Sequence, residues 1–326
     1  MKPTLFALIL IPLLVGLSAC SAAPATPSPA QPEPSATLEI LPSLAPAVEQ
    51  ASTPAVTQVP AASLEPAASS APAAPRPTLS PDAWQTLPVI PTVSASARSI
   101  FQRGLQLGND PKRFSKIGDC QNVESYFLAV FEKPGEYDLG PDYASLSETI
   151  DYYNGSFSRD SLAVKGGYNV AAILTPLRAD PKACQKTESP LDCELRAWQP
   201  TVAIVSLEEW WADRPIDEYG AYLRKAVNLL INRGVVPILA TRAGNDEHSL
   251  ALNAEIASLA YEYDLPLWNF WLAIQPLENH GLISDGFHLT YARNIFTDPQ
   301  RMKSAWPWRN LTALQVLDAV RKGLTQ

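Results

Sequence analysis

The strongest constraint on the fold is the alternation of short apolar runs with segments of helical periodicity from residue 112 onward. The apolar runs are predicted strands at 114–117, 202–207, 235–240 and 267–270, and helices are predicted at 216–233, 249–263 and 311–324. Apolar strands that alternate with helices are typical of a parallel sheet covered on both faces. We therefore expect an α/β domain: a three-layer α/β/α fold with a flavodoxin-like parallel sheet of about five strands.

Residues 1–20 have the pattern of an export signal. Lys2 supplies positive charge, residues 5–17 are apolar, and Leu17-Ser18-Ala19-Cys20 follows, as in a bacterial lipoprotein signal. The alternatives are an ordinary secretory signal and a short transmembrane anchor, but the apolar run is shorter than the roughly 20 residues that span a bilayer. We expect Cys20 to carry the lipid, anchoring the chain to the bacterial membrane with its domain outside the cytoplasm.

Residues 21–91 consist mainly of Ala, Pro, Ser, Thr and Glu, with almost no aromatic side chains. Such a segment cannot bury enough apolar surface to offset its chain entropy, so it is predicted to be a disordered, Pro-rich tether. Residues 92–326 then suit a single domain of ordinary size.

The net charge of −8 argues against nucleic acid as a partner. The sequence contains neither a cluster of metal-ligand residues nor a phosphate-binding Gly-rich loop, so we expect neither a metal nor a cofactor.

The four cysteines separate by context. Cys184 and Cys193 lie close together in a polar region of a chain predicted to be exported, which predicts a disulfide between them. With Cys20 assigned to the lipid, Cys120 is the remaining thiol, and such a thiol is either reactive or buried.

Two short motifs predict a hydrolytic site. Gly118-Asp119-Cys120 closes the first predicted strand, and Asp285-Gly286-Phe287-His288 forms a Gly-containing turn near the C-terminus. An Asp and a His three residues apart can face one cleft, where the Asp orients the imidazole and the imidazole takes a proton from a nucleophile. Glu208 also follows a predicted strand, at the sheet edge where ligands bind in parallel sheets.

With these motifs, the chain resembles the SGNH, or GDSL-type, hydrolases over roughly residues 112 to 326. That family contains esterases, lipases and carbohydrate deacetylases with a three-layer α/β/α fold. Its Gly-Asp-Ser motif is matched by Gly118-Asp119-Cys120, and its Asp-x-x-His motif is matched in full by Asp285 to His288. Its second-motif glycine corresponds to Gly166 or Gly167. Its third motif, Gly-x-Asn-Asp, falls on Ser206-Leu207-Glu208-Glu209.

The resemblance implies roles for these residues. Cys120 would attack an acyl carbonyl, His288 would relay the proton, and Asp285 would orient His288. The oxyanion would be held by backbone N–H groups of Cys120 and of Gly166 or Gly167. The family's Asn donor is replaced by Glu208, whose carboxylate would repel the developing charge, so weak or lost ester hydrolysis is expected.

Three other interpretations stay open. Cys120 can act as a thiol nucleophile for esters. Alternatively, Asp285 and His288 only stabilise their turn. In the third, the cleft is a non-catalytic carbohydrate-binding module, in which Glu208, Glu209, Asp285 and His288 hydrogen-bond a sugar against a wall of Trp210 and Trp211, joined by Trp268 and Trp271.

Gly244-Asn245-Asp246 is similar to the third motif but lies one strand too late. It is predicted to be a loop and helix start, with Asp246 or His248 near the N-cap.

Overall fold

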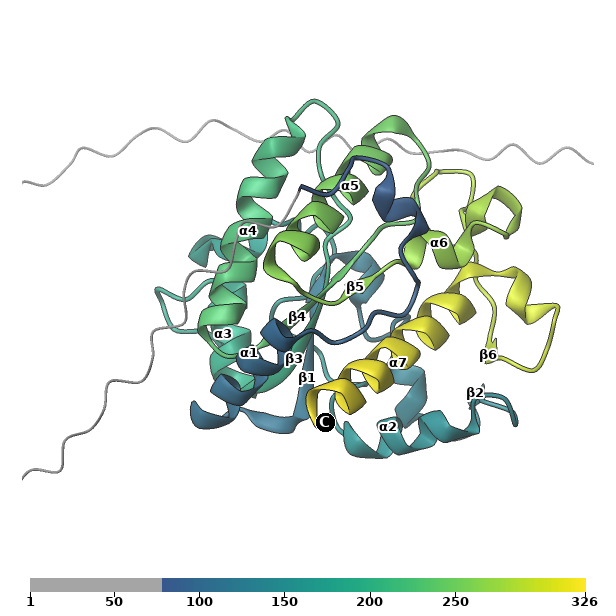
Figure 1. Cartoon of the computed structure of the whole chain (residues 1–326), viewed down its shortest axis with the longest axis horizontal. Coiled ribbons are helices and arrows are strands. Elements are labelled where there is room, and N and C mark those ends of the chain that lie inside the picture. The colour runs from purple at the N-terminus through teal and green to yellow at the C-terminus, as the bar shows by residue number, and fades with distance from the viewer. Residues whose placement is uncertain (1–77) are drawn as a thin grey trace, which may run out of the picture. The chain divides into compact units, whose positions relative to one another are not determined.

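The computed structural model describes residues 78–326, which form an α/β domain around a parallel sheet (Figure 1). The sheet has four strands in the order β1-β3-β4-β5. Their bounds are β1 Asp110–Gly118, β3 Pro200–Ser206, β4 Val236–Ala240 and β5 Leu267–Trp268. The register places Gly118 opposite Ser206 and Ala240 opposite Trp268, so the carboxyl ends of the strands lie along one edge.

A further parallel bridge joins Val164 to Gly118, outside the named strands. This bridge stands where the second strand of a flavodoxin-like sheet would lie, so the predicted five strands are present as four strands and one bridge. A separate two-stranded parallel sheet pairs β2 Tyr137–Asp138 with β6 Asn294–Ile295.

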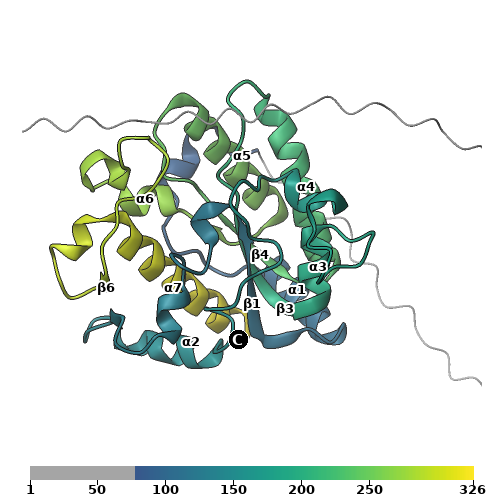
Figure 2. The ribbon, with the colours of Figure 1, turned by 180° about the vertical axis from the view of Figure 1, so that it is seen from behind.

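Helices lie on both sides of the main sheet, which confirms the predicted three-layer α/β/α fold (Figures 1 and 2). They are α1 Ala95–Gln106, α2 Ser147–Tyr152, α3 Pro190–Trp198, α4 Ile216–Asn232, α5 Glu247–Tyr263, α6 Phe270–Ile274 and α7 Ala305–Leu324. Helices α4 and α5 pack on each other and on β4, whereas α7 packs on α1, α2 and α6.

The core explains the sequence pattern. Every residue of β3 is buried, as expected for a central strand covered on both faces. The apolar stripe of α4 is buried as predicted, with Tyr219, Leu223, Ala226, Val227 and Leu230 facing inward. Gly234, with φ +69°, follows α4, and a Cβ there would lie 2.4 Å from the Gly104 Cα, so a side chain does not fit.

The packed region begins upstream of the predicted boundary at residue 91. Trp84, in the short 3₁₀ helix Ala83–Thr86, is 1% exposed and meets Trp271 edge to face at 4.9 Å. Asn269 Nδ2 donates to the carbonyl oxygens of Trp84 and Leu87. The buried Trp84 ring and these two hydrogen bonds hold Trp84 and Leu87 on the domain, so part of the segment predicted as tether is packed.

The disulfide between Cys184 and Cys193 is present, as predicted. Among residues 78–326, no helix is both long enough and apolar enough to cross a membrane. The predicted signal at 1–20 with Cys20, and the part of the predicted tether up to residue 77, lie outside the described residues.

Candidate active site

Cys120 lies two residues after the end of β1, at the carboxyl edge of the sheet. It opens the 3₁₀ helix Cys120–Asn122, and Asp119 caps that turn by accepting a hydrogen bond from the Gln121 N–H. The Cys120 Sγ lies 3.9 Å from Nε2 of His288 and 3.8 Å from Oε1 of Glu209. The thiol therefore sits between a base and a carboxylate.

Asp285 fixes the His288 ring. Its Oδ2 lies 2.6 Å from Nδ1 of His288, and its Oδ1 accepts the backbone N–H groups of Phe287 and His288 at 2.9 Å each. These hydrogen bonds, from the Phe287 N–H first, lower the pKa of Asp285 to about 2. Asp285 is therefore ionised at neutral pH, and the other ring nitrogen of His288 points to the thiol.

The surroundings of Cys120 oppose thiolate formation. Burial raises the pKa of the thiol to about 12, and the carboxylates of Asp119, Glu209 and Glu208 add to this shift. Reactive cysteines are activated in the opposite way, by cations or metals that lower the thiol pKa. At neutral pH Cys120 is therefore almost entirely protonated.

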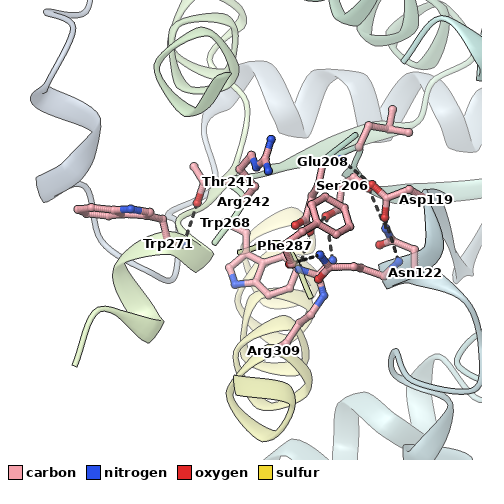
Figure 3. A network of polar contacts seen from close by, with 12 residues as sticks. Asp119, Asn122, Ser206, Glu208, Thr241, Arg242, Trp268, Trp271, Phe287 and Arg309 are labelled. Atoms are coloured by element: carbon pink, nitrogen blue, oxygen red, sulfur yellow. Dashed lines mark hydrogen bonds and ion pairs between the residues drawn. The ribbon is translucent and has the colours of Figure 1, made fainter. Parts of the chain in front are cut away.

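The Glu208 carboxylate pairs with a buried arginine, and among residues 78–326 it makes no hydrogen bond to Cys120. Its side chain is 2% exposed, and its Oε1 lies 2.9 Å from Nη1 of Arg309 and accepts a hydrogen bond from the Ser206 hydroxyl (Figure 3). Arg309 comes from α7, is fully buried, and lies among the rings of Phe127, Trp268, Phe270 and Trp306. The buried guanidinium draws the Glu208 carboxylate inward.

Glu209 is the acid beside the nucleophile. Its backbone N–H lies 3.3 Å from Asp119 Oδ2, and its carboxylate is the one that approaches the Cys120 sulfur. A carboxylate therefore lies next to Cys120, as expected from the substituted third motif. It belongs to Glu209 and not to Glu208.

Asp119 ties the ends of β1 and β3 together. It is fully buried, and its carboxylate accepts backbone N–H groups from Gln121 at 2.9 Å and Glu208 at 2.6 Å. Burial, and then the neighbouring Glu208, raise its pKa. Asn122 adds a second link by donating from Nδ2 to the carbonyl oxygen of Ser206 (Figure 3). This network fixes the turn that presents Cys120.

The glycine loop lies beside Cys120, as the second motif predicts. A Cβ on Gly166 would be 3.8 Å from the Cys120 Cβ, and Gly167 has φ +79°. The loop is held to the sheet because the Lys165 N–H donates to the Gly118 carbonyl oxygen. The structure thus brings together Cys120, His288, Asp285, Gly166, Gly167 and Glu209, while the Glu208 carboxylate lies at the edge of the same cavity and is paired with Arg309.

A cavity of about 410 Å³ adjoins these groups. It is lined by Gly167, Asn169, Glu208, Glu209, Trp210, Trp211, Arg242, His248, Phe287 and His288. Trp211 is 53% exposed at its rim, whereas Trp210 is largely buried and packs on Tyr219. Trp268 is fully buried against Phe127, and Trp271 packs on Trp84, so these two do not extend the predicted wall.

Two solved structures resemble this chain. One is the psychrotrophic esterase EstA from Pseudoalteromonas sp., with 14% identity and a TM-score of 0.41 over 66% of this chain and 100% of that chain. The other is a GDSL-like lipase from Bacteroides thetaiotaomicron VPI-5482, with 15% identity and a TM-score of 0.39 over 69% of this chain and 97% of that chain. No family model and no curated protein matches.

The Gly118-Asp119-Cys120 turn at the end of β1 and the Asp285–His288 pair before α7 meet at one edge of the parallel sheet. The three-layer α/β/α fold is the one that the resemblance to SGNH/GDSL hydrolases predicts. Asp246 is the N-cap of α5 and accepts from the Ser249 N–H, so the Gly244-Asn245-Asp246 segment is a helix start, as predicted.

Arg242 is the main residue of this cleft that was not predicted from the sequence. It follows β4 by two residues, is 8% exposed, and its guanidinium carbon lies 5.6 Å from the centre of the Phe287 ring. The position of Arg242 in the sequence could have identified it, because polar residues just after a strand of a parallel sheet lie at the edge where ligands bind.

Proposed function

We propose that this chain is an exported, lipid-anchored protein whose SGNH/GDSL hydrolase-like domain binds an acylated glycan or acyl-ester ligand and hydrolyses it weakly or not at all. The observation that carries this proposal is the Glu209 carboxylate 3.8 Å from the Cys120 sulfur.

The carboxylate opposes the charge that acyl transfer creates. Attack on a carbonyl by Cys120 would place negative charge on an oxygen close to the attacking sulfur. The removal of one hydrogen-bond donor from such a site costs about 10²–10³ in rate, and an ionised acid there adds repulsion. The protonated thiol lowers the rate further, because the thiolate is the nucleophile.

The export and anchoring part of the proposal depends on the lipoprotein-like signal that ends at Cys20. The Cys184–Cys193 disulfide supports it, because such bonds persist in oxidising compartments outside the cytoplasm. A Pro-rich tether would hold the domain away from the membrane that the lipid enters.

A thiol esterase is the second candidate. The spatial arrangement of Cys120, His288 and Asp285, with His288 between the other two, favours it. Nε2 of His288 lies 3.9 Å from the sulfur and Nδ1 lies 2.6 Å from Asp285, as a relay requires. In that reaction His288 takes the thiol proton as sulfur bonds to the acyl carbon, then gives the proton to the leaving alkoxide. Water, activated by His288, then cleaves the thioester.

Hydrolysis of p-nitrophenyl butyrate separates the two candidates. We expect the wild-type rate to equal that of a Cys120→Ala variant, since the thiol contributes little. Robust wild-type hydrolysis that Cys120→Ala abolishes would establish the thiol esterase instead. Binding of the catalytically inert protein to a glycan array then tests the ligand class directly.

A further inference from the structure

Arg242 is a buried cation that lines the cavity and lacks an acidic partner. Its side chain is 8% exposed, and its Nε makes no hydrogen bond within residues 78–326. No carboxylate of the described residues forms an ion pair with it. Its backbone N–H and carbonyl are both held by the Asn253 side chain, so the residue is fixed in place.

Two other arginines that are largely withdrawn from solvent each have an acidic partner. The buried Arg309 pairs with Glu208, and Arg159, whose side chain is 20% exposed, pairs with the buried Glu194. Arg242 is one of the groups that lower the pKa of Asp246, after the hydrogen bonds from Ser249, but the Asp246 carboxylate caps α5 through the N–H and hydroxyl of Ser249. A buried charge is stable when it is paired, so an unpaired one that faces a cavity indicates an anion supplied by a ligand.

We propose that the cavity binds an acidic sugar residue, with Arg242 receiving its carboxylate. A guanidinium holds a carboxylate through two parallel hydrogen bonds, which suits the planar acid group of a uronic acid. The exposed ring of Trp211 at the rim offers a face for the sugar. Asn169 and Glu209 offer polar atoms for its hydroxyl groups.

The cavity lining contains both signs of charge. Glu209 approaches the Cys120 sulfur, and Arg242 packs against Phe287, whose ring lies 5.0 Å from that of His288. A neutral sugar would leave Arg242 unpaired. This inference deepens the proposed function by naming the ligand class, but it requires no bond to be broken.

Binding of trigalacturonate, followed by tryptophan fluorescence and calorimetry on the purified protein, tests the inference. Galactotriose is the neutral control, and glutarate is a carboxylate without a sugar ring. We expect trigalacturonate to bind at least roughly tenfold more tightly than either control, because a hydrogen-bonded charge pair contributes that much. Added salt should weaken this preference.

Substitutions locate the effect. Arg242→Gln should remove the preference for trigalacturonate over galactotriose, and Arg242→Lys should keep part of it. Arg224→Gln is the matched control, since Arg224 pairs with Glu262 outside the cavity, and it should bind as the wild type does. Thermal unfolding of each variant shows whether it is folded.

Three results would overturn the inference: equal binding of trigalacturonate and galactotriose to the wild type, glutarate binding as tight as trigalacturonate, or an undiminished preference in folded Arg242→Gln. If Arg242→Gln does not fold, the wild-type comparison alone decides. None of these ligands has an ester bond, so this outcome is independent of whether Cys120 hydrolyses esters. A failed inference is thereby distinguished from a failed proposal of lost hydrolysis.

Discussion

The buried network beneath the cleft and the open floor of the cleft both contain acidic side chains. The acid in the network is paired with a cation, whereas the acid on the floor is not, within the part of the chain that the structure describes. In the network, Glu208 lies 2.9 Å from a guanidinium nitrogen of Arg309, with the Ser206 hydroxyl contacting both residues. On the floor, Glu209 lies 3.8 Å from the Cys120 sulfur, and no ion pair to it is present among residues 78–326.

The difference follows from the partner that each acid meets beyond the end of β3. The Glu208 carboxylate meets the buried Arg309, whereas the Glu209 carboxylate meets the Cys120 sulfur. Glu208 therefore stabilises the fold, and Glu209 affects the reactivity of Cys120. The resemblance to the third motif predicted both acids at the site and put Glu208 in place of the Asn donor, whereas Glu209 is the one that contacts Cys120.

The largest expected effect concerns stability. Glu208→Asn should lower the free energy of unfolding by about 3–5 kcal/mol, because it leaves the fully buried Arg309 without its partner. Glu209→Asn, in the partly open cleft, should change it by less than about 0.5 kcal/mol. Urea unfolding of both variants measures the contrast, and equal losses would remove the distinction between scaffold and floor.

A smaller effect is expected from Ser206→Ala. The Ser206 hydroxyl accepts from Arg309 Nη2 at 2.9 Å and donates to Glu208 Oε1 at 3.1 Å, while the ion pair itself remains. We expect a loss of about 1 kcal/mol in the free energy of unfolding, which is typical of a buried hydrogen bond. A loss as large as that of Glu208→Asn would mean that the hydroxyl, and not the ion pair, holds the network.

The smallest expected effect concerns the Cys120 thiol, whose reactivity should differ between the folded and the unfolded chain. The folded thiol has its pKa raised to about 12, whereas an unfolded thiol ionises near about 8.5. Between these values the unfolded chain is a thiolate and the folded chain is not, so stability should fall as the pH rises through this window. Iodoacetamide should therefore label Cys120 far more slowly in native than in unfolded protein at pH about 9.

Glu209→Gln sharpens that measurement, because it removes one of the carboxylates that raise the thiol pKa. Labelling of native Glu209→Gln should be faster than that of the wild type at the same pH, and a thermal melt should show that both are folded. Rapid labelling of native wild type would contradict the protonated thiol and favour an activated cysteine.

Features set by local pattern were predictable from the sequence. Apolar runs between helices gave the layered fold, a nine-residue separation gave the Cys184–Cys193 disulfide, and a four-residue turn placed Asp285 against His288. The direction of Glu208 was not predictable, because its partner Arg309 lies about a hundred residues further on. Trp84 was hidden in a Pro-rich segment, and its burial depends on contacts near Trp271 and Asn269.

The Glu209 carboxylate is the group expected to suppress ester hydrolysis in the cleft. Recovery of hydrolysis after its replacement tests this most directly. A Cys120→Ser/Glu209→Asn variant restores a hydroxyl nucleophile and a neutral amide beside His288 and Asp285. Its kcat/KM for p-nitrophenyl butyrate should exceed that of Cys120→Ser/Glu209→Gln/His288→Ala, and that of the wild type, by about 10²–10³, or about 2.7–4 kcal/mol. A Cys120→Ser/Glu208→Asn variant should gain nothing. Recovery through Glu208→Asn, or a folded Cys120→Ser/Glu209→Asn variant that stays inert, would contradict the assignment of Glu209.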